Sequence, residues 1–357
     1  MVNSGSSANL AMIEALLRPS KGPAILSKGD GVLVPAIAWP TTIWPLIQLG
    51  LEPFFVDVDP QTLVMDFEKA RHIVENSNKK IRAVFPIHPL GLGIQDSILD
   101  EFSQSLNLVL INDVCESLGS WQGDRHSGTR GKLSSFSFYF SHHMTTMEGG
   151  GVATDDEEIY NDLKSIRSHG WSRDRTDIDD WSMEIHPSLR KFTFISSGYN
   201  IRPMEIQAAV GRTQLRDLDK MIGQRRKTVA YITEALEDSP LRVLGAPNSG
   251  EILSFKRHSW MHIPISVRTQ NPQVDLYRIV RYLEDLGIET RPPLTGNFTK
   301  QPAMSRFKDL SIKNQNYPAA DYVSETTFLV GCHQGLSELQ VEYLGANLTK
   351  VSKLVKK

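Results

Sequence analysis

The order of apolar and amphipathic segments predicts a doubly wound α/β domain followed by a smaller α+β domain. In the first half, short apolar runs rich in Val, Ile and Phe read VLVPAIAW, PFFVDV, IRAVFPI, LNLVLIND and SSFSFYF. Stretches with helical spacing separate several of these runs, among them TIWPLIQLGL and SILDEFSQSL. Strands that alternate with amphipathic helices are typical of a mostly parallel sheet with helices on both faces.

The chain begins with an expected helix, in which Leu10, Ile13 and Leu17 share one face. Ser6 or Ser7 is well placed to cap this helix, because a hydroxyl oxygen accepts from free N–H groups of the first turn. The same N–H groups and the helix dipole favour a bound phosphate. A simple cap stays open as the alternative.

The pattern changes after Pro203, where a long helical stretch runs to about Leu236. Its expected apolar contacts are Ile206, Ala209, Val210 and Leu215. A strand-like stretch WMHIPISV and the helical stretches VDLYRIVRYLEDLG and SELQVEYLGANLTKVSKLV follow. We therefore expect a large domain over residues 1–222 and a small C-terminal domain over residues 223–357.

The composition excludes several classes of function. A formal net charge of -2 without a Lys/Arg run gives no reason to expect a nucleic acid or an anionic membrane as partner. No apolar run has membrane-spanning length, and the start has no signal-peptide pattern. Two cysteines, Cys115 and Cys332, are too few for a disulfide framework or a four-cysteine metal cluster and suit a reducing cytosol. We expect a cytoplasmic protein without a metal site.

The segment SFSFYFSHHMTTMEGGG, residues 135–151, carries the most specific pattern in the chain. It resembles the cofactor-lysine segment of the DegT/DnrJ/EryC1/StrS sugar aminotransferase family, which belongs to the fold-type I superfamily that uses pyridoxal phosphate (PLP). In that family a serine lies five residues before the lysine that binds the cofactor covalently. Counted from Ser137, this places His142 at the lysine position.

The neighbouring residues offer no substitute for the lysine. Lys132 precedes the expected strand, and Lys164 falls in the helical stretch after the turn. Adjacent histidines are also a poor metal pair, because neighbouring side chains on a strand face opposite sides. An imidazole cannot form the covalent bond that a lysine amine forms with PLP. The resemblance therefore implies that PLP or pyridoxamine phosphate (PMP) is bound non-covalently.

Other motifs appear in the family's order over essentially the whole chain. NSGSSAN matches the phosphate-binding turn, which implies that Ser6 and Ser7 hold the cofactor phosphate. Ser137 is a further cofactor contact that the resemblance implies. PAIAWPTT matches the segment whose aromatic residue stacks on the pyridine ring and nominates Trp39. A core tryptophan after a buried strand is the alternative interpretation.

INDVCESLG matches the segment whose aspartate faces the pyridine nitrogen, which assigns that role to Asp113. An ordinary carboxylate at a strand end is the alternative, although ligands of α/β sheets bind at strand carboxyl ends. Glu116 stands where the aminotransferases usually carry glutamine, near the cofactor's phenolic oxygen. The dehydratase branch tends to carry Cys-Glu here. Asn112 replaces a common glutamate, and the sequence gives no reason for it.

Two further segments imply contacts with a partner subunit and with substrate. GYNIRPMEIQAAVG resembles the segment that crosses the dimer interface, so Asn200 would contact the cofactor phosphate of the partner subunit in a homodimer. GIETRPPLTGNF resembles a substrate loop in which Arg291 pairs with a nucleotide diphosphate, because a guanidinium fork suits phosphate oxygens. Arg173, in the aperiodic stretch 168–197, is a second expected substrate contact. An exposed arginine in a solvated loop stays open as the alternative for Arg291.

Histidine at the lysine position, Glu116 and the SHGW loop together resemble the sugar 3-dehydratases of this family. One kind acts on GDP-4-keto-6-deoxy-D-mannose without another redox centre. The other acts on a CDP-linked sugar and needs an iron–sulfur cluster and a reductase partner. The cysteines of that cluster follow the cofactor segment, where this chain has none.

The self-contained kind fits better. The resemblance therefore implies C3 dehydration of a nucleotide-linked 4-keto-6-deoxy hexose, with GDP-4-keto-6-deoxy-D-mannose as the expected substrate, in 3,6-dideoxysugar biosynthesis. L-glutamate would restore PMP, and no iron–sulfur reductase partner would be needed. With an ordinary pKa of about 6.5, His142 would remove a proton near neutral pH and assist departure of the C3 hydroxyl.

Three alternatives remain at this point. The same chemistry on a CDP- or dTDP-sugar is one, because no motif securely reads the base. A non-catalytic relative that lost the lysine is another. The family usually carries a further segment before NSGSSAN, so either the start is mis-assigned or an N-terminal helix is missing.

Overall fold

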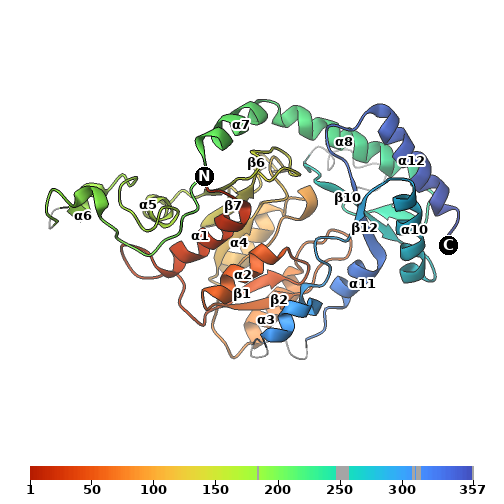
Figure 1. Cartoon of the computed structure of the whole chain (residues 1–357). Helices are drawn as coiled ribbons and strands as arrows, with labels where there is room; N and C mark the ends of the chain where they lie inside the picture. The colour runs from red at the N-terminus through yellow and green to blue at the C-terminus, as the bar shows by residue number, and fades with distance from the viewer. Residues whose placement is uncertain (183–184, 247–256, 308–309, 311–314, 356–357) are drawn as a thin grey trace.

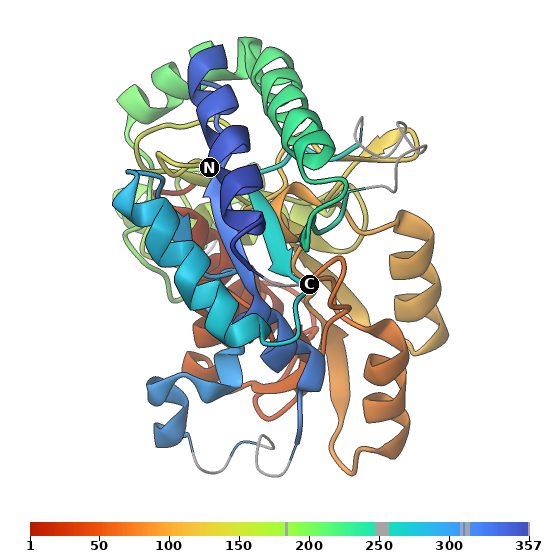
Figure 2. The same ribbon diagram turned by 90° about the vertical axis from the view of Figure 1, so that its right-hand side faces the viewer.

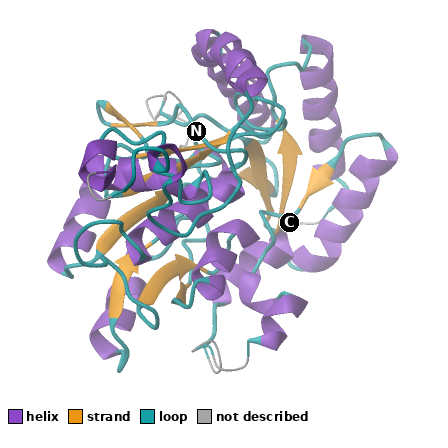
Figure 3. Cartoon of the chain, turned by 60° about the vertical axis from the view of Figure 1, so that its left-hand side comes forward, coloured by secondary structure: helices purple, strands orange, loops and turns teal. Residues whose placement is uncertain are grey.

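The computed structural model describes residues 1–182, 185–246, 257–307, 310 and 315–355. Two separate groups of strands organise the chain (Figure 1 and Figure 3). The larger is a six-stranded sheet with strand order β2-β1-β3-β4-β7-β8. Its members are β1 (Gly31–Pro35), β2 (Glu52–Val56), β3 (Ile81–Val84), β4 (Val109–Asp113), β7 (Leu133–Ser137) and β8 (Gly150–Ala153). The first five are parallel, and β8 runs antiparallel to β7, which confirms the predicted mixed, mostly parallel sheet.

Helices cover both faces of this sheet because its strands are apolar on both sides. Val32 and Val34 pack into one core with α1 (Gly5–Leu17), α2 (Pro40–Gln48) and α5 (Glu157–Ile166). Leu33, between them, packs into the opposite core with α3 (Phe67–Asn76) and α4 (Asp96–Ser105). Side chains alternate along a strand, so a continuous apolar run supplies both cores.

The second sheet is antiparallel and lies in the C-terminal part, as predicted. Its order is β11-β12-β10-β9, formed by β9 (Leu241–Val243), β10 (His262–Val267), β11 (Thr290–Arg291) and β12 (Thr327–Gly331). Figure 2 shows α10 (Pro272–Asp285) and α12 (Glu338–Ser352) in front of this sheet. Short elements η3 (Phe298–Lys300) and η4 (Pro302–Arg306) return toward the large sheet.

The predicted long helix after Pro203 is two helices, α7 (Glu205–Arg216) and α8 (Leu218–Ala235), which meet at Asp217. Three of the expected apolar contacts, Ile206, Ala209 and Leu215, are exposed within one chain, Ile206 and Leu215 by 58% and 59%. The expectation is therefore wrong for these residues. Helix α8 runs unbroken through residues 222 and 223, and Phe298 packs into the core of the large sheet. The division into two domains at that point stays a prediction.

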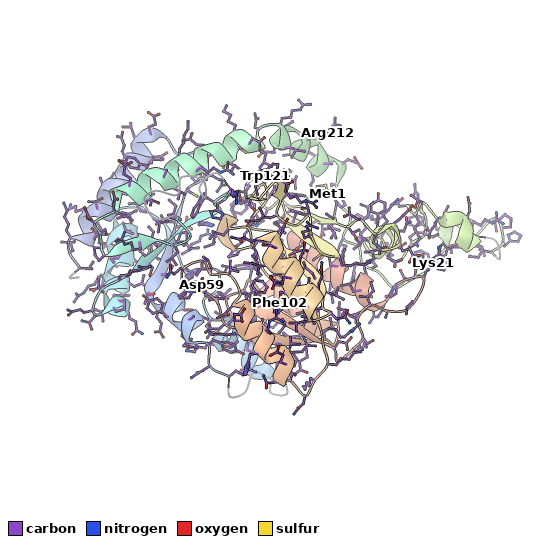
Figure 4. All side chains as sticks on the ribbon, turned by 180° about the vertical axis from the view of Figure 1, so that it is seen from behind. Met1, Lys21, Asp59, Phe102, Trp121 and Arg212 are labelled. Atoms are coloured by element: carbon purple, nitrogen blue, oxygen red, sulfur yellow. The ribbon has the colours of Figure 1, made fainter. Side chains whose placement is uncertain are left out.

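The aperiodic stretch predicted at residues 168–197 is mostly irregular and extends away from the rest of the chain (Figure 1). It contains α6 (Ile178–Ser182) and η2 (Arg190–Phe192). The buried Arg175 anchors it, with ion pairs to Asp162 on α5 at 2.8 Å and to Asp177 at 2.6 Å. Lys21, labelled in Figure 4 beside this stretch, also pairs with Asp177.

Within the described residues, no helix combines the length and apolar character that crossing a membrane requires.

The buried carboxylate of Asp57 ties the C-terminal part to the large sheet. It accepts from the backbone N–H groups of Ala319 and Ala320, in the first turn of α11 (Pro318–Thr326), at 3.1 and 2.8 Å. It also pairs with Lys69 at 2.9 Å. A carboxylate satisfies the free donors of a helix N-terminus and its dipole.

We predict that Asp57→Ala lowers the free energy of unfolding by about 2–4 kcal/mol, because two helix donors and one ammonium lose their partner. Urea denaturation followed by circular dichroism measures this. The control is Asp59→Ala. Among the described residues, the Asp59 carboxylate accepts only an exposed turn N–H from Gln61, so its loss should cost less than about 1 kcal/mol. Equal losses in the two variants would contradict the role of Asp57.

Candidate active site

The carboxyl ends of β1, β3 and β4 meet at one edge of the large sheet. Trp39 follows β1, His88 follows β3, and β4 ends at Asp113. Strands β2 and β3 lie on opposite sides of β1, so the strand order reverses there. Ligands of open α/β sheets bind at the carboxyl ends beside such a reversal. The fold therefore places the predicted residues at its ordinary ligand-binding edge.

Both carboxylate oxygens of the buried Asp113 accept hydrogen bonds. Oδ2 accepts from Asn9 Nδ2 on α1 at 2.9 Å and from Thr42 Oγ1 on α2 at 2.7 Å. Oδ1 accepts from the backbone N–H of Cys115 at 3.1 Å. These bonds fix the carboxylate, and Oδ1 keeps a free lone pair that can accept from a further donor.

Asn9 and Thr42 are functional residues that sequence reasoning missed. Each ends a motif that the sequence analysis used for a different residue. Asn9 is the last residue of NSGSSAN, and Thr42 is the last residue of PAIAWPTT. Their presence at the ends of both motifs was the available signal. Only the folded chain shows that the two side chains converge on one oxygen of Asp113.

The N-terminus of α1 differs from the sequence expectation in one respect. Ser4 caps the helix, because its Oγ accepts from the backbone N–H of Ser7 at 3.0 Å. The expected cap at Ser6 or Ser7 is therefore wrong, and both residues lie in the first helical turn. The N–H groups of Gly5 and Ser6 precede the first intrahelical bond and point out of the helix end. This is the geometry of an anion site.

Two glycines let this helix end pack against the large sheet. A Cβ atom on Gly5 would lie 2.7 Å from Cβ of Ser137, and one on Gly150 would lie 2.3 Å from the Ser4 carbonyl oxygen. Both distances are shorter than any ordinary Cβ contact. The absence of side chains at these positions therefore brings Ser137, at the end of β7, beside the first turn of α1. The predicted set Ser6, Ser7 and Ser137 lies together.

His142 lies in the turn after β7. Its backbone N–H donates to the Tyr139 carbonyl at 3.0 Å, and the two rings meet edge to face with centroids 6.0 Å apart. Ring atom Nδ1 is buried and has no hydrogen-bond partner among the described residues. Burial lowers the pKa of His142 to about 4; Asp113 opposes this shift, and Arg225 adds to it. The expected ordinary pKa near 6.5 is therefore wrong, and the imidazole is neutral at pH 7.

The two candidate lysines have other partners. Lys132 forms an ion pair with Asp156, and the ammonium of Lys164 lies 5.0 Å from the ring centroid of Tyr160 on the same helix. Neither takes the place of His142.

Glu116 lies close to Asp113 and accepts from the backbone N–H of Leu90 at 3.0 Å. Burial raises the pKa of Glu116 to about 7; the Leu90 N–H opposes this shift, and the negative charge of Asp113 adds to it. The side chain therefore changes protonation state near neutral pH.

The structure explains why asparagine stands at position 112, where the family commonly carries glutamate. The backbone N–H of Ile94 donates to Nδ1 of the fully buried His88 at 3.1 Å, so Nε2 carries the proton and donates to Asn112 Oδ1 at 3.2 Å. Asn112 Nδ2 in turn donates to the Arg130 carbonyl at 2.7 Å. A neutral amide suits this site, because burial lowers the pKa of His88 to about 4 and leaves its ring uncharged.

Trp39 is 53% exposed at the N-terminus of α2, within one turn of Thr42. It is not a core tryptophan, so its ring has a free face. Asn200 is exposed, and its side chain accepts from Arg202 at 3.2 Å. The adjacent Ile201 carbonyl accepts from the backbone N–H of Asn3 at 2.9 Å, so this segment runs beside the start of α1.

The two predicted substrate arginines are exposed. Arg173 lies over the ring of Trp171, with its guanidinium 5.1 Å from the centroid. Arg291, on β11, pairs with Glu289 at 2.9 Å and faces His262 at the start of β10. The structure thus brings Asp113 and Glu116 close to the three serines at the start of α1 and the end of β7. Among the described residues of a single chain, no hydrogen bond or ion pair joins Asn200 or Arg173 to this group.

No three His, Cys, Asp or Glu side chains among the described residues are arranged to hold a metal ion. Cys115 and Cys332 are both free thiols.

The model of the DegT/DnrJ/EryC1/StrS aminotransferase family matches residues 1–349. The chain belongs to this family. It is 35% identical over 336 residues to GDP-4-keto-6-deoxy-D-mannose 3-dehydratase of Yersinia pseudotuberculosis, covering 94% of this chain and 82% of the relative. The protein of the same name in Escherichia coli O55:H7 is 36% identical over 352 residues, covering 96% and 86%. dTDP-4-dehydro-2,6-dideoxy-D-glucose 3-dehydratase of Saccharopolyspora spinosa is 31% identical, covering 96% and 74%.

Solved structures of family members agree with the fold. A variant of GDP-4-keto-6-deoxymannose 3-dehydratase with bound GDP-perosamine superimposes with a TM-score of 0.86 at 34% identity, covering 97% of this chain and 87% of that one. A structure of this enzyme with a trapped PLP-glutamate geminal diamine has a TM-score of 0.84 at 34% identity, covering 97% and 87%. The predicted PLP-aminotransferase fold is confirmed.

In this family member, Glu116 should make stability depend on pH. Its folded-state pKa lies above the unfolded value, so ionisation disfavours the folded state. The cost is absent below about pH 4.5 and complete above about pH 7. We predict that Glu116→Gln, which keeps an acceptor for Leu90, is more stable than the native protein at pH 8 by up to about 3 kcal/mol and equal to it near pH 4.5. Urea denaturation of cofactor-free protein at both pH values measures this, and a pH-independent difference would contradict it.

Proposed function

We propose that the protein is a PLP/PMP-dependent 3-dehydratase that removes the C3 hydroxyl of GDP-4-keto-6-deoxy-D-mannose, with L-glutamate restoring PMP. The observation that carries this proposal is His142. A partly buried imidazole, neutral at pH 7, lies in the turn after β7, in the position that the family pattern gives to lysine. The names of the Yersinia and Escherichia relatives and the bound GDP-perosamine support the substrate, and the trapped PLP-glutamate species supports the amino donor.

The residues present fit PLP or PMP. The first turn of α1 with Ser6, Ser7 and Ser137 offers hydroxyls and free N–H groups for the phosphate. Asp113 Oδ1 can accept from the ring nitrogen, and the free face of Trp39 can stack on the ring. Glu116, which titrates near neutral pH, suits a position beside the phenolic oxygen. These assignments are part of the proposal.

When bound, the cofactor supplies an electron sink for charge that develops beside the sugar C4 carbon. Asp113, fixed by Asn9 and Thr42, holds the proton on the ring nitrogen that this role requires. His142 is neutral at pH 7, so its ring could take a proton from the C4′ carbon of the bound cofactor and give it to the departing C3 hydroxyl, which would leave as water. A lysine at this position could bind the cofactor covalently in place of the PMP amine. An imidazole cannot, so the nitrogen of PMP would be free to leave as ammonia.

The substrate contacts belong to the same proposal. Arg291 and Arg173 are exposed, so their guanidinium groups are accessible to a diphosphate. A second candidate is the same reaction on another nucleotide sugar. The name of the Saccharopolyspora relative favours a dTDP-sugar, and a CDP-sugar stays open beside it. A non-catalytic relative is a third. We also propose that no iron–sulfur reductase partner is needed, and the cytoplasmic location stays a prediction.

A homodimer completes the proposal. Helix α7 carries exposed apolar residues, as does the segment before it: Met204, Ile206, Leu215, Leu189, Phe192 and Phe194. Phe192 and Phe194 both stack on Trp171. Exposed apolar patches of this kind mark interaction sites. Asn200 lies in the chain between these groups, so a second copy docked here would receive its side chain, as the family pattern implies.

The activity is tested by incubating the protein with PLP, L-glutamate and a panel of GDP-, CDP- and dTDP-linked 4-keto-6-deoxy hexoses. We expect loss of the C3 hydroxyl with release of ammonia from the GDP-sugar, followed by NMR. A stable amino sugar as product would contradict the proposal. Preferential turnover of the CDP- or dTDP-sugar would support the second candidate, and no turnover of any sugar would favour a non-catalytic relative.

His142→Lys should lower formation of the 3-deoxy sugar at least about 100-fold, because the base is replaced by a tether. Borohydride treatment followed by mass spectrometry should attach PLP irreversibly to this variant and leave the native protein unmodified. His142→Asn, which loses the base without gaining a tether, should lose activity without cofactor attachment. Sustained formation of the 3-deoxy sugar by His142→Lys would contradict the role of His142 as the base.

Ile206→Glu should shift sedimentation from dimer to monomer, since it places a charge in an apolar interface. Leu339→Glu is the control, because Leu339 is 77% exposed on α12, outside the proposed surface. A native protein that sediments as a monomer would overturn the dimer, and so would a dimeric Ile206→Glu variant.

A further inference from the structure

Arg225 is a buried arginine at the junction of the two sheets. Its side chain extends from α8, and its relative exposure is 1%. Nη1 donates to the carbonyls of Trp260 at 3.1 Å and Met261 at 3.0 Å, which directly precede β10. Nη2 donates to the His142 carbonyl at 3.5 Å. One side chain therefore joins the turn that carries His142 to the start of the second sheet.

Among the described residues, no carboxylate forms an ion pair with Arg225. Its Nε has no hydrogen-bond partner there either. Its remaining contact is Sγ of Cys332, at 4.0 Å. A buried cation with only carbonyl partners costs stability. A residue held only for stability would do better as an apolar side chain of similar volume, which points to another role.

Imidazoles surround this uncompensated charge. Burial lowers the pKa of His142, His143, His262 and His333, and the positive charge of Arg225 adds to this shift in all four. For His142 the groups that face it are Arg225 from α8, Asp113 from β4, His143 beside it and His262 from β10. Asp113 favours the charged imidazole and Arg225 the neutral one, so the two act in opposite directions on the proposed base.

We propose that Arg225 is a positioning residue for the proposed reaction, which holds the His142 turn against the start of β10 through its bonds to the His142, Trp260 and Met261 carbonyls. Its positive charge adds to the effect of burial on the His142 imidazole. This rests on the proposed function of His142. Arginine suits the task because its planar fork donates to several carbonyls at once and stays charged when buried. Lysine would keep the charge but reach fewer of the three carbonyls, so the two roles are separable by substitution.

The test compares Arg225→Met and Arg225→Lys with matched variants of the next residue. Arg226 donates to the His258 carbonyl at 2.7 Å and so holds the same segment without touching His142. Arg226→Met and Arg226→Lys are therefore the controls. Thermal unfolding and circular dichroism establish that each variant is folded.

Histidine C2 hydrogen–deuterium exchange, followed residue by residue with mass spectrometry, measures the pKa of His142 without substrate. We expect this pKa to rise by about one unit or more in Arg225→Met and to stay near the native value in Arg225→Lys and both Arg226 variants. In turnover with PLP, L-glutamate and the GDP-sugar, kcat should fall about 10-fold in both Arg225 variants with KM changed less than about threefold. The acid limb of the kcat profile should move to higher pH only in Arg225→Met.

An unchanged His142 titration in Arg225→Met together with native kcat in both Arg225 variants would overturn the proposal. It would also be overturned if neither Arg225 variant folds while both Arg226 variants do, since Arg225 would then serve stability alone. A native protein that turns over no sugar refutes the proposed function instead, and the titration in substrate-free protein still tests Arg225.

Discussion

The first turn of α1 lies against the ends of β7 and β8 more closely than side chains would permit, and the arrangement of the site depends on this contact. Gly5 and Gly150 provide the space. With the helix seated there, its next turn carries Asn9 to Asp113, and its free N–H groups lie beside Ser137. A methyl group at either glycine would push the helix outward and disturb both the proposed phosphate site and the orientation of the carboxylate.

The His142 imidazole lies in the field of two opposite charges, the Asp113 carboxylate and the Arg225 guanidinium. Asp113 and Arg225 act on the imidazole from different elements, and burial decides the outcome in favour of the neutral ring. Glu116 responds to the same environment in the opposite sense, because burial and Asp113 both favour its protonated form. The local sequence Ser-His-His therefore acquires its acid–base character from residues more than 20 positions away in the chain.

Much of the fold could be predicted from the sequence. The five apolar runs of the first half became β1, β2, β3, β4 and β7, because each run is long enough for a strand with both faces buried. Asp113 was predicted at a strand end and lies there. The errors share a cause: Ser4 rather than Ser6 or Ser7 caps α1, and Ile206 and Leu215 are exposed, because each depends on where an element ends or what packs against it.

The sequence by itself determined the strand pattern, the family and the identity of the residue in place of the lysine, because these depend on residue type and spacing along the chain. Only the tertiary structure decided that Asn9 and Thr42 share one oxygen of Asp113, that Asn112 is the neutral partner of His88, and that Arg225 touches the His142 turn. The pKa values of His142 and Glu116 were also decided there. Hydrogen bonds and desolvation depend on distances between segments that the folded chain alone brings together.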